Sequence, residues 1–373
     1  MRSSINLGRI AGVQIGLNWT WLVIFGLIVW SLGAEVFPTE NPGQSDGAYA
    51  AMAFAAAILF FTSLVLHEVG HAVVARREGM EIEGITLWLF GGVAKFKGMF
   101  PSPGAEFRIA IAGPVVTLVL GTSFLLGAWL LPLPASIDGV ITWLGYVNAF
   151  LLGFNLLPAL PLDGGRVLRA TIWHLRGDFA QATRFAGGLG RMFGQAMVAF
   201  GLVSALFAGA PGGLWLALIG WFLIQASSAE TGLVAAREAL AGLRVEDAMT
   251  ADPAAAPAAA TVREFMEDVF ARSRHSAYPV LDDGRAVGIV SFRALAAVPR
   301  ADWDRVLVAD RMEPLEQSLV LDRGGSLADA LPELVQSSLG RAIVRSNGHP
   351  AGLLTLTDVQ RLLELRELTG SPS

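Results

Sequence analysis

Six long apolar segments occupy the first 230 residues of the chain, and each is close to the length of a membrane-spanning helix. A spanning helix needs about 20 mostly apolar residues, and a slightly shorter one is accommodated by tilt or by neighbouring protein. The pattern therefore predicts a polytopic α-helical membrane domain with about six transmembrane helices. Their expected positions are Ile15–Leu32, Ala50–Ala75, Ile109–Leu131, Val140–Leu157, Gly188–Phe207 and Leu214–Ala229.

The segment Glu81–Phe96, between the second and third apolar segments, follows a different pattern. It is apolar and rich in residues that favour strands, and Gly91 and Gly92 interrupt it. This combination predicts a membrane-associated β-hairpin or looped strand rather than a helix. An irregular interfacial connector is the alternative.

The chain changes character after about residue 230, and an internal repeat begins at Arg244. The sequence Val245-Glu-Asp-Ala-Met249 is echoed by Val308-Ala-Asp-Arg-Met312. A predicted helix, an apolar strand and a Gly-apolar-apolar-Ser/Thr sequence follow each copy. The chain is thus expected to contain a membrane domain at residues 1–230 and a soluble α/β domain at 244–365, with repeats at about 244–300 and 307–365.

The composition agrees with one domain in lipid and one in water. Hydrophobic residues make up 53% of the 373 residues and charged residues only 16%, against about 25% charged residues in soluble domains. The chain has no cysteine, which excludes disulfides and Cys-ligated zinc or iron–sulfur sites. A metal would have to be held by His, Asp or Glu. The net charge of −5 gives no reason to expect a nucleic-acid partner.

Lys and Arg alternate between the connections of the apolar segments. The connections at residues 33–49, 132–139 and 208–213 contain none, whereas the others carry several. The positive-inside rule then predicts a multi-pass protein of the cell (inner) membrane with both termini and the C-terminal domain in the cytoplasm. Arg2 and Arg9 precede the first apolar segment without a small-residue cleavage site after it, so we expect a retained first span.

The sharpest motif is His67-Glu-Val-Gly-His71, near the end of the second apolar segment. Positions i and i+4 share one helix face, so two imidazoles can bind one zinc ion, and Glu68 between them can act as a general base. His67 lies roughly 25 Å along the span, inside the membrane and nearer its cytoplasmic face. Ionisable residues at such depth are costly and usually functional. A polar helix-packing cluster is the alternative.

A catalytic zinc site needs a third protein ligand and an open position. The fourth apolar segment ends in Asn155-Leu-Leu-Pro-Ala-Leu-Pro-Leu-Asp163, in which Pro158 and Pro161 break the helix. Irregular backbone at membrane depth is tolerated only where it is buried in protein or lines a watery cavity. Asp163 is therefore the candidate third ligand, and a simple turn with a helix cap is the alternative.

The pairing of HExxH in a transmembrane segment with N-x-x-P-x-x-P-L-D-G some 90 residues later resembles the site-2 protease family of intramembrane zinc metalloproteases. The resemblance covers roughly residues 1–230. It implies that His67, His71 and Asp163 bind one Zn²⁺ per chain and that Glu68 activates water. It also implies that Asn155 binds the substrate or stabilises the oxyanion.

The order Phe90-Gly-Gly-Val-Ala94 resembles the family's β-structure beside the active site. Gly91, Gly92 and Val93 would then bind an unwound substrate as an added strand. The implied activity is hydrolysis of peptide bonds within transmembrane segments, as in regulated intramembrane proteolysis. The implied partners are the lipid bilayer and a single-span membrane protein: an anti-sigma factor, a membrane-held transcription factor or a remnant signal peptide.

The C-terminal repeats resemble a pair of cystathionine-β-synthase (CBS) motifs, modules that often bind adenosine nucleotides such as ATP or AMP. The second repeat keeps the family's ribose-binding pattern as Thr355-Leu-Thr-Asp358, whereas Ala294 takes the acidic position in the first. The resemblance implies one nucleotide site, at Thr355 and Asp358. A purely structural role, such as homodimerisation through the CBS domains, is equally open.

A membrane metal transporter or channel with a regulatory CBS pair is the alternative function. Transport would need ionisable residues along a path through the membrane, whereas here they cluster at one depth around Glu68. The sequence favours the protease.

Overall fold

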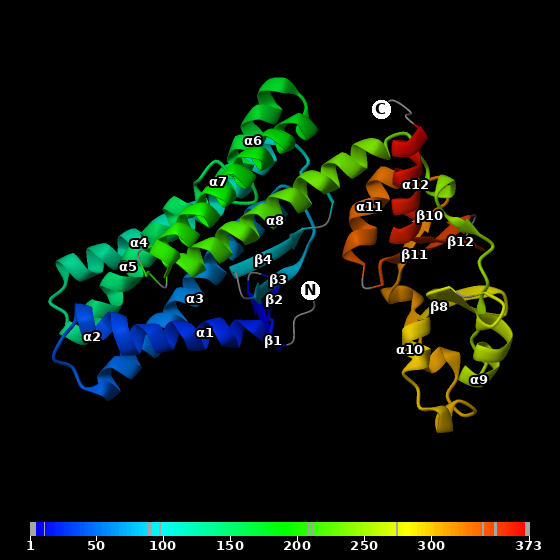
Figure 1. Ribbon diagram of the computed structural model, residues 1–373, viewed down its shortest axis with the longest axis horizontal. Helices are drawn as coiled ribbons and strands as arrows, with labels where there is room; N and C mark the ends of the chain where they lie inside the picture. Colours follow the sequence, from blue (N-terminus) through cyan, green and yellow to red (C-terminus); the bar gives the residue numbers. More distant parts are fainter. Residues whose placement is uncertain are drawn as a thin grey trace. The chain divides into compact units, whose positions relative to one another are not determined.

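The computed structural model describes residues 5–10, 12–88, 91–96, 98–207, 209–210, 212–273, 275–337, 339–346 and 349–369. The chain divides into two compact units, Met1–Gly232 and Leu233–Ser373 (Figure 1).

Six helical segments in the described part of the chain are long and apolar enough to cross a membrane, which confirms the expected number. The first, Thr20–Glu40, combines α1 (Thr20–Ser31), a π-helical turn η1 (Leu32–Val36) and α2 (Phe37–Glu40). The others are α3 (Asp46–Arg77), α4 (Pro103–Leu130), α5 (Ala135–Asn155), α7 (Phe179–Phe207) and α8 (Gly212–Ala239).

A further helix of the first unit, α6 (Asp163–Arg176), is too short to span a bilayer. It begins directly after the irregular backbone that follows α5, and it ends at Gly177, whose φ of 73° lies in the left-handed region. Helix α6 packs against α4 and α7. Asp163 therefore occupies the buried first turn of a short helix whose last turn is exposed.

The first unit also contains a four-stranded sheet in the order β1-β2-β3-β4. Strands β3 (Ile82–Trp88) and β4 (Gly91–Phe96) form the expected antiparallel hairpin, whose residues 89 and 90 lie outside the described residues. Gly91 and Gly92 are strand residues of β4. A second hairpin, β1 (Ile5–Ile10) and β2 (Val13–Leu17), adds to it through parallel pairing of β2 with β3.

This N-terminal hairpin corrects the expected start of the first span. The apolar run was expected to enter the membrane at Ile15, but Val13, Ile15 and Leu17 are buried strand residues, and the helix begins at Thr20. Val13 packs with Ala72 of α3 and Ile85 of β3. The alternate apolar residues of β2 thus lie on the sheet face that packs against α3, as is typical of half-buried strands.

Small residues let α7 and α8 approach closely, as the glycine series of α7 predicts. A Cβ on Gly194 would lie 2.7 Å from the carbonyl oxygen of Gly220, and one on Gly201 would lie 2.5 Å from that of Gly213. Backbone contact of this kind is common between membrane helices.

The second unit contains two four-stranded sheets, in the orders β6-β7-β8-β9 and β10-β11-β12-β5. Strand β5 follows the first Val…Met sequence and pairs with β12 of the second repeat. Strand β9 follows the second Val…Met sequence and pairs with β8 of the first repeat. Each repeat therefore adds one short strand to the sheet of the other. The elements are η2 (Val245–Asp247), β5 (Thr250–Ala251), β6 (Ala256–Pro257), α9 (Val262–Glu264), η3 (Phe265–Phe270), β7 (Ala277–Asp282), β8 (Arg285–Ser291), α10 (Phe292–Ala296), η4 (Arg300–Asp302), η5 (Val308–Arg311), β9 (Glu313–Pro314), η6 (Leu315–Gln317), β10 (Leu319–Asp322), α11 (Leu327–Gln336), β11 (Arg341–Ser346), β12 (His349–Thr355) and α12 (Leu356–Thr369).

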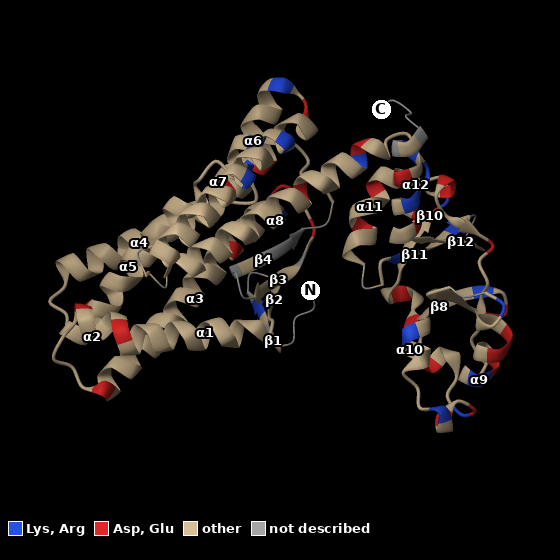
Figure 2. Cartoon of the chain, viewed as in Figure 1, with Lys and Arg blue, Asp and Glu red and all other residues tan. Residues whose placement is uncertain are grey.

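Charge is distributed differently in the two units (Figure 2). The long helices of the first unit are almost uncharged, with acidic residues near α2 and basic residues around α6, whereas charges of both signs cover the second unit. The apolar-to-polar change expected near residue 230 is therefore also visible in the structure.

Candidate active site

Two imidazoles and one carboxylate converge between α3 and α6. His67 Nε2 lies 3.1 Å from Asp163 Oδ2, His71 Nε2 lies 3.3 Å from Asp163 Oδ1, and the two Nε2 atoms are 3.1 Å apart. A tetrahedral ion about 2.1 Å from each ligand separates its ligands by about 3.4 Å. Within the described residues, this is the one group of three or more candidate ligands close enough to hold a metal ion.

The other nitrogen of each ring has a partner on α4. His71 Nδ1 lies 2.7 Å from the carbonyl oxygen of Ile109, and His67 Nδ1 lies 2.8 Å from Thr117 Oγ1. A carbonyl can only accept, so Nδ1 of His71 carries the hydrogen and its Nε2 lone pair faces Asp163. Such outer partners commonly fix the tautomer and orientation of metal-binding histidines. No sequence motif marks either residue, since a single Thr or a backbone carbonyl has no distinctive pattern.

The donor set fits zinc, and α4 leaves room for it. Asp163 Oδ2 is buried without a hydrogen bond although it lies 3.1 Å from His67 Nε2, so both atoms face the same point. A Cβ on Gly113 would lie 2.6 Å from His67 Nε2 and closer still to that of His71. Two neutral imidazoles and one carboxylate form a ligand set that zinc commonly has in proteins.

Two glycines let the chain deliver Asp163 to this point. A Cβ on Gly164 would collide with the carbonyl group of Leu156, and one on Gly165 would collide with that of Ala159. The irregular segment is also tied to neighbouring helices, since Leu160 N donates to Ala186 O over 3.2 Å and Ser227 Oγ donates to Leu160 O. The motif's glycines are thus required for close packing of backbone on backbone.

Glu68 lies beside strand β4. A Cβ on Gly92 would lie 2.5 Å from Glu68 Cγ, so the glycine allows the strand to approach the carboxylate closely. Gly91 and Val93 flank this point in β4. Asn155 is the last residue of α5 and is half-buried; the backbone next to it, at Leu156, contacts Gly164.

A buried charge cluster lies farther along α6. Arg169 Nε donates to Glu106 Oε1 over 2.7 Å, and its Nη1 donates to Glu230 Oε1 over 2.6 Å. Arg169 is only 2% exposed and Glu106 is fully buried. Arg169 lies between the fourth and fifth apolar segments, where the sequence pattern predicts a cytoplasmic connection. Its burial follows from the packing of α6 against α4, which no local pattern reveals.

In the second unit, Thr355 and Asp358 contact each other at the start of α12. Asp358 Oδ2 accepts from Thr355 N over 3.0 Å and from Thr355 Oγ1 over 2.7 Å. At the matching place in the first repeat, Ser291 Oγ accepts from Ala294 N, with no carboxylate present. The geometry makes Asp358 a helix-capping residue with its second carboxylate oxygen outside the cap.

Comparisons with known proteins find two families in the chain. Residues 55–133 and 132–201 match the model of peptidase family M50, and residues 245–300 match the model of the CBS domain. Rip3 of Mycobacterium tuberculosis, which is named as a zinc metalloprotease, is 40% identical over 377 residues that cover 99% of this chain and 95% of Rip3.

This chain belongs to peptidase family M50.

Other M50 relatives share most of the chain. The zinc metalloprotease MJ0392 of Methanocaldococcus jannaschii is 28% identical over 99% of this chain and 98% of its own length. A solved structure described as a site-2 protease from the same organism is 31% identical, covers 61% of this chain and 94% of that one, and superimposes with a TM-score of 0.44. The M50 protein described here is a zinc metalloprotease of the site-2 type with a CBS domain, which decides between protease and transporter.

Proposed function

We propose that this M50 protein hydrolyses peptide bonds within the transmembrane segments of single-span membrane proteins. The observation that supports the proposal best is the convergence of His67, His71 and Asp163, within 3.3 Å of one another, inside a bundle of helices long enough to span a membrane. In this proposal residues 1–230 form the protease domain, and residues 244–365 form a regulatory CBS pair.

The site residues have separate roles in this proposal. His67, His71 and Asp163 hold one Zn²⁺ per chain, with Thr117 and the Ile109 carbonyl orienting the two imidazoles. Zinc at such a site supplies Lewis acidity toward the scissile carbonyl and makes water a nucleophile near neutral pH. Glu68 takes the proton of the attacking water and passes it to the leaving amine nitrogen. Asn155 donates to the substrate or to the developing oxyanion.

Substrate would be held as an added strand. Strand β4 is the last strand of its sheet and contacts Glu68 through Gly92. An unwound segment that pairs with Gly91–Val93 would bring its backbone to the catalytic carboxylate. Val93→Pro or Ala94→Pro should reduce cleavage, because proline removes a backbone donor from the edge. Unchanged cleavage in both variants would exclude capture at β4.

The proposed orientation places both termini and the CBS pair in the cytoplasm, in a multi-pass protein of the inner membrane. The charge distribution supports it, with Arg residues around α6 and the opposite connections free of Lys and Arg (Figure 2). Reporter fusions after Leu32 and Leu131 should report outside, and fusions after Arg77, Arg176 and Arg244 inside. A cytoplasmic signal at Asn41 would contradict this topology.

The proposed substrates are anti-sigma factors, membrane-held transcription factors or remnant signal peptides, cut in regulated intramembrane proteolysis. Adenine nucleotide, ATP or AMP, would bind the CBS pair at Thr355 and Asp358 and adjust the cleavage rate. Ligand can do so only if it binds one state of the protein better than another. The CBS pair could also join two chains into a homodimer.

Replacement of Glu68 by Gln tests the catalytic part of the proposal. The change is nearly isosteric and spares the three ligands, so the variant should retain about one zinc per chain and lose cleavage of a single-span substrate in proteoliposomes. Zinc is measured by atomic spectroscopy and cleavage by gel shift. Cleavage at the wild-type rate by Glu68→Gln would remove Glu68 from the mechanism. Trapping of bound proteins by the same variant in cells would identify the substrate.

A further inference from the structure

Arg166 of α6 presents an unpaired guanidinium next to the candidate metal site. It follows Asp163 by three residues, and side chains three positions apart are neighbours on a helix surface. Its Nε is buried without a hydrogen bond, but the residue as a whole is only half-buried. Within the described part of the chain, its two terminal nitrogens form no hydrogen bond or ion pair. These nitrogens therefore reach open space and are free to donate.

Glu68 is a second half-buried charge at the same place. Its carboxylate forms no hydrogen bond or ion pair with any residue that the structure describes. Arg166 and Glu68 interact electrostatically, but they are not in hydrogen-bond contact. The two opposite charges thus stay apart at the site, and each can still meet a ligand.

The acidic residues farther along α6 do not occupy Arg166. Its charge also interacts with those of Glu106 and Glu230. Both carboxylates, however, accept their hydrogen bonds from Arg169, which lies three residues beyond Arg166. The buried ion pair therefore accounts for Arg169 and leaves the donors of Arg166 unused.

Peptide hydrolysis creates one anion whatever the sequence of the substrate. Water adds to the scissile carbonyl carbon and the C–N bond breaks. One fragment then ends in a carboxylate, and the amine of the other fragment takes the proton that the acid loses. A carboxylate formed away from bulk water is costly unless a cation meets it. The two terminal nitrogens of a guanidinium match the two oxygens of a carboxylate in a bidentate pair.

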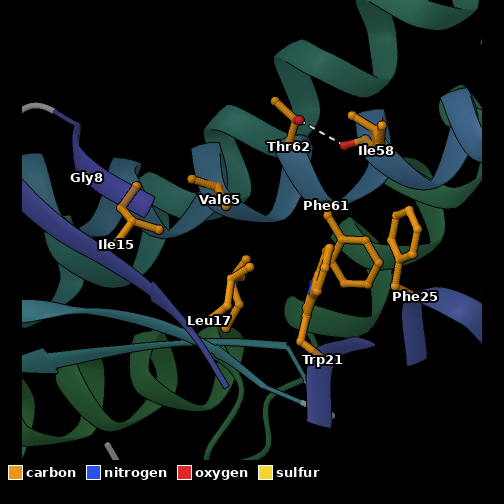
Figure 3. A pocket seen from close by; sticks show the side chains of 10 residues that line it. Gly8, Ile15, Leu17, Trp21, Phe25, Ile58, Phe61, Thr62 and Val65 are labelled. Atoms are coloured by element: carbon orange, nitrogen blue, oxygen red, sulfur yellow. Dashed lines mark hydrogen bonds between the residues drawn. The ribbon is translucent and has the colours of Figure 1, made fainter. Parts of the chain in front are cut away.

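An apolar cavity elsewhere in the first unit offers no such partner. It encloses about 320 Å³ between α1, α3 and the sheet, with Leu17, Phe61 and Leu87 in its lining (Figure 3). The hydroxyl of Thr62 at its border donates to the Ile58 carbonyl over 2.8 Å. A carboxylate in that cavity would meet no cation, whereas one beside Glu68 would meet Arg166.

We propose that Arg166 binds the new C-terminal carboxylate of the cleaved transmembrane segment through its two terminal nitrogens. The inference rests on the proposed protease function and adds a product-binding residue to it. A carboxylate held at Arg166 is compensated by the cation although Glu68, a like charge, is close. The fragment on the N-terminal side of the cut should therefore bind more tightly as a free acid than as an amide.

The test measures binding of product peptides to the full-length protein in liposomes. Mass spectrometry first locates the cut in a single-span substrate. The N-terminal fragment is then made with a fluorescent label and with either a carboxylate or a carboxamide at its end. Wild type should bind the carboxylate peptide at least about tenfold more tightly, as measured by fluorescence anisotropy. Zinc also binds carboxylates, so both peptides are measured with zinc-loaded and zinc-depleted protein, and the preference should persist in both.

Arg166→Gln removes the charge, so the zinc-depleted variant should bind the two peptides with affinities within about twofold of each other. Arg166→Lys keeps the charge but loses the two-pronged donor, so it should retain part of the preference; it also tests the proposal if the Gln variant does not fold. Arg176→Gln is the matched control, because it is the same change at an exposed position in the last turn of the same helix. It should keep the full preference. Melting temperature and zinc content show that each variant folds.

A full preference for the carboxylate peptide in folded Arg166→Gln would refute the proposal. A third peptide, an amide whose last residue is Glu, has its carboxylate on a side chain. If it binds as tightly as the free acid and loses that affinity in Arg166→Gln, Arg166 selects acidic substrate residues and the product site is wrong. Wild type that cleaves the substrate but binds acid and amide equally refutes the product site alone. Wild type that cleaves no single-span substrate refutes the protease function itself.

Discussion

Arg169 and Glu106 form an ion pair that is almost completely removed from solvent, and Arg169 also donates to Glu230. The three residues come from α6, α4 and α8. Arg169 follows Asp163 by six residues in α6. The helix that presents the candidate metal ligand is therefore held in place by buried charges in addition to apolar packing.

Arg169→Ala should destabilise the membrane unit strongly. Its loss leaves Glu106 fully buried and Glu230 partly buried without their cation, and breaking a buried pair in this way costs about 3–5 kcal/mol. We expect a clearly lower melting temperature in detergent and reduced zinc content, because α6 loses its anchor. Arg108→Ala is the control. Arg108 pairs with Glu78, but its side chain is 56% exposed, so the substitution should lower the free energy of unfolding by no more than about 1 kcal/mol. Equal effects in both variants would contradict this role of Arg169.

Gly113→Ala should remove zinc binding although alanine favours helices more than glycine does. The added Cβ would enter the space in front of both Nε2 atoms, 2.6 Å from that of His67. Zinc per chain, measured after dialysis, should fall well below that of wild type. Gly127→Ala is the matched control in the same helix, since its Cβ would meet only Ile141 Cγ2 at 3.9 Å. Full zinc occupancy in Gly113→Ala would show that the ion binds at another place.

Thr117→Val tests whether the outer partner of His67 matters. Valine has the same shape but cannot hydrogen-bond to Nδ1, which lies 2.8 Å from the Thr117 hydroxyl. Loss of such partners typically costs about 10–100-fold in metal affinity or activity, so competition with a zinc chelator should show weaker binding. Thr122→Val, at an exposed position of α4 where the hydroxyl bonds only to the helix backbone, should leave the affinity unchanged. An unchanged zinc affinity in Thr117→Val would argue against orientation by this hydroxyl.

Asp358→Ala should weaken adenine-nucleotide binding by about tenfold or more, because a hydrogen bond to a charged acceptor is worth roughly 1.5–3 kcal/mol. Calorimetry with ATP and AMP on the full-length protein measures it; the full chain is preferred because Leu240, before the repeats, is fully buried in the core of the second unit. Glu264→Ala removes a similar helix cap, from Thr261 in the first repeat, and should not alter binding.

The converse substitution tests whether a second nucleotide site can be created in the first repeat. Ala294→Asp places a carboxylate beside Ser291 as Asp358 stands beside Thr355, and it should raise the number of nucleotides bound per chain from one toward two. Absence of heat with any adenine nucleotide in wild type would leave the CBS pair as a dimerisation or docking element.

The sequence determined the features that local pattern controls. Six apolar runs predicted six spanning helices, because hydrocarbon requires helices of about 20 apolar residues. The repeated Val…Met sequence predicted the two halves of the CBS unit. Spacing alone put His67 and His71 on one helix face, and the proline-broken end of the fourth segment singled out Asp163.

Tertiary structure decided what depends on contacts between distant segments. The first apolar run divides between β2 and α1 because Val13, Ile15 and Leu17 cover α3. A short apolar run is compatible with either a strand or a helix, so the sequence alone cannot place this division. Thr117, Ile109 and Gly113 surround the histidines only because α4 crosses α3 at that point. Arg169, which the sequence suggests is solvated, is buried because two carboxylates from other helices meet it there. Such pairings join residues about 60 positions apart in the chain, and their energy comes from burial that only the folded bundle creates.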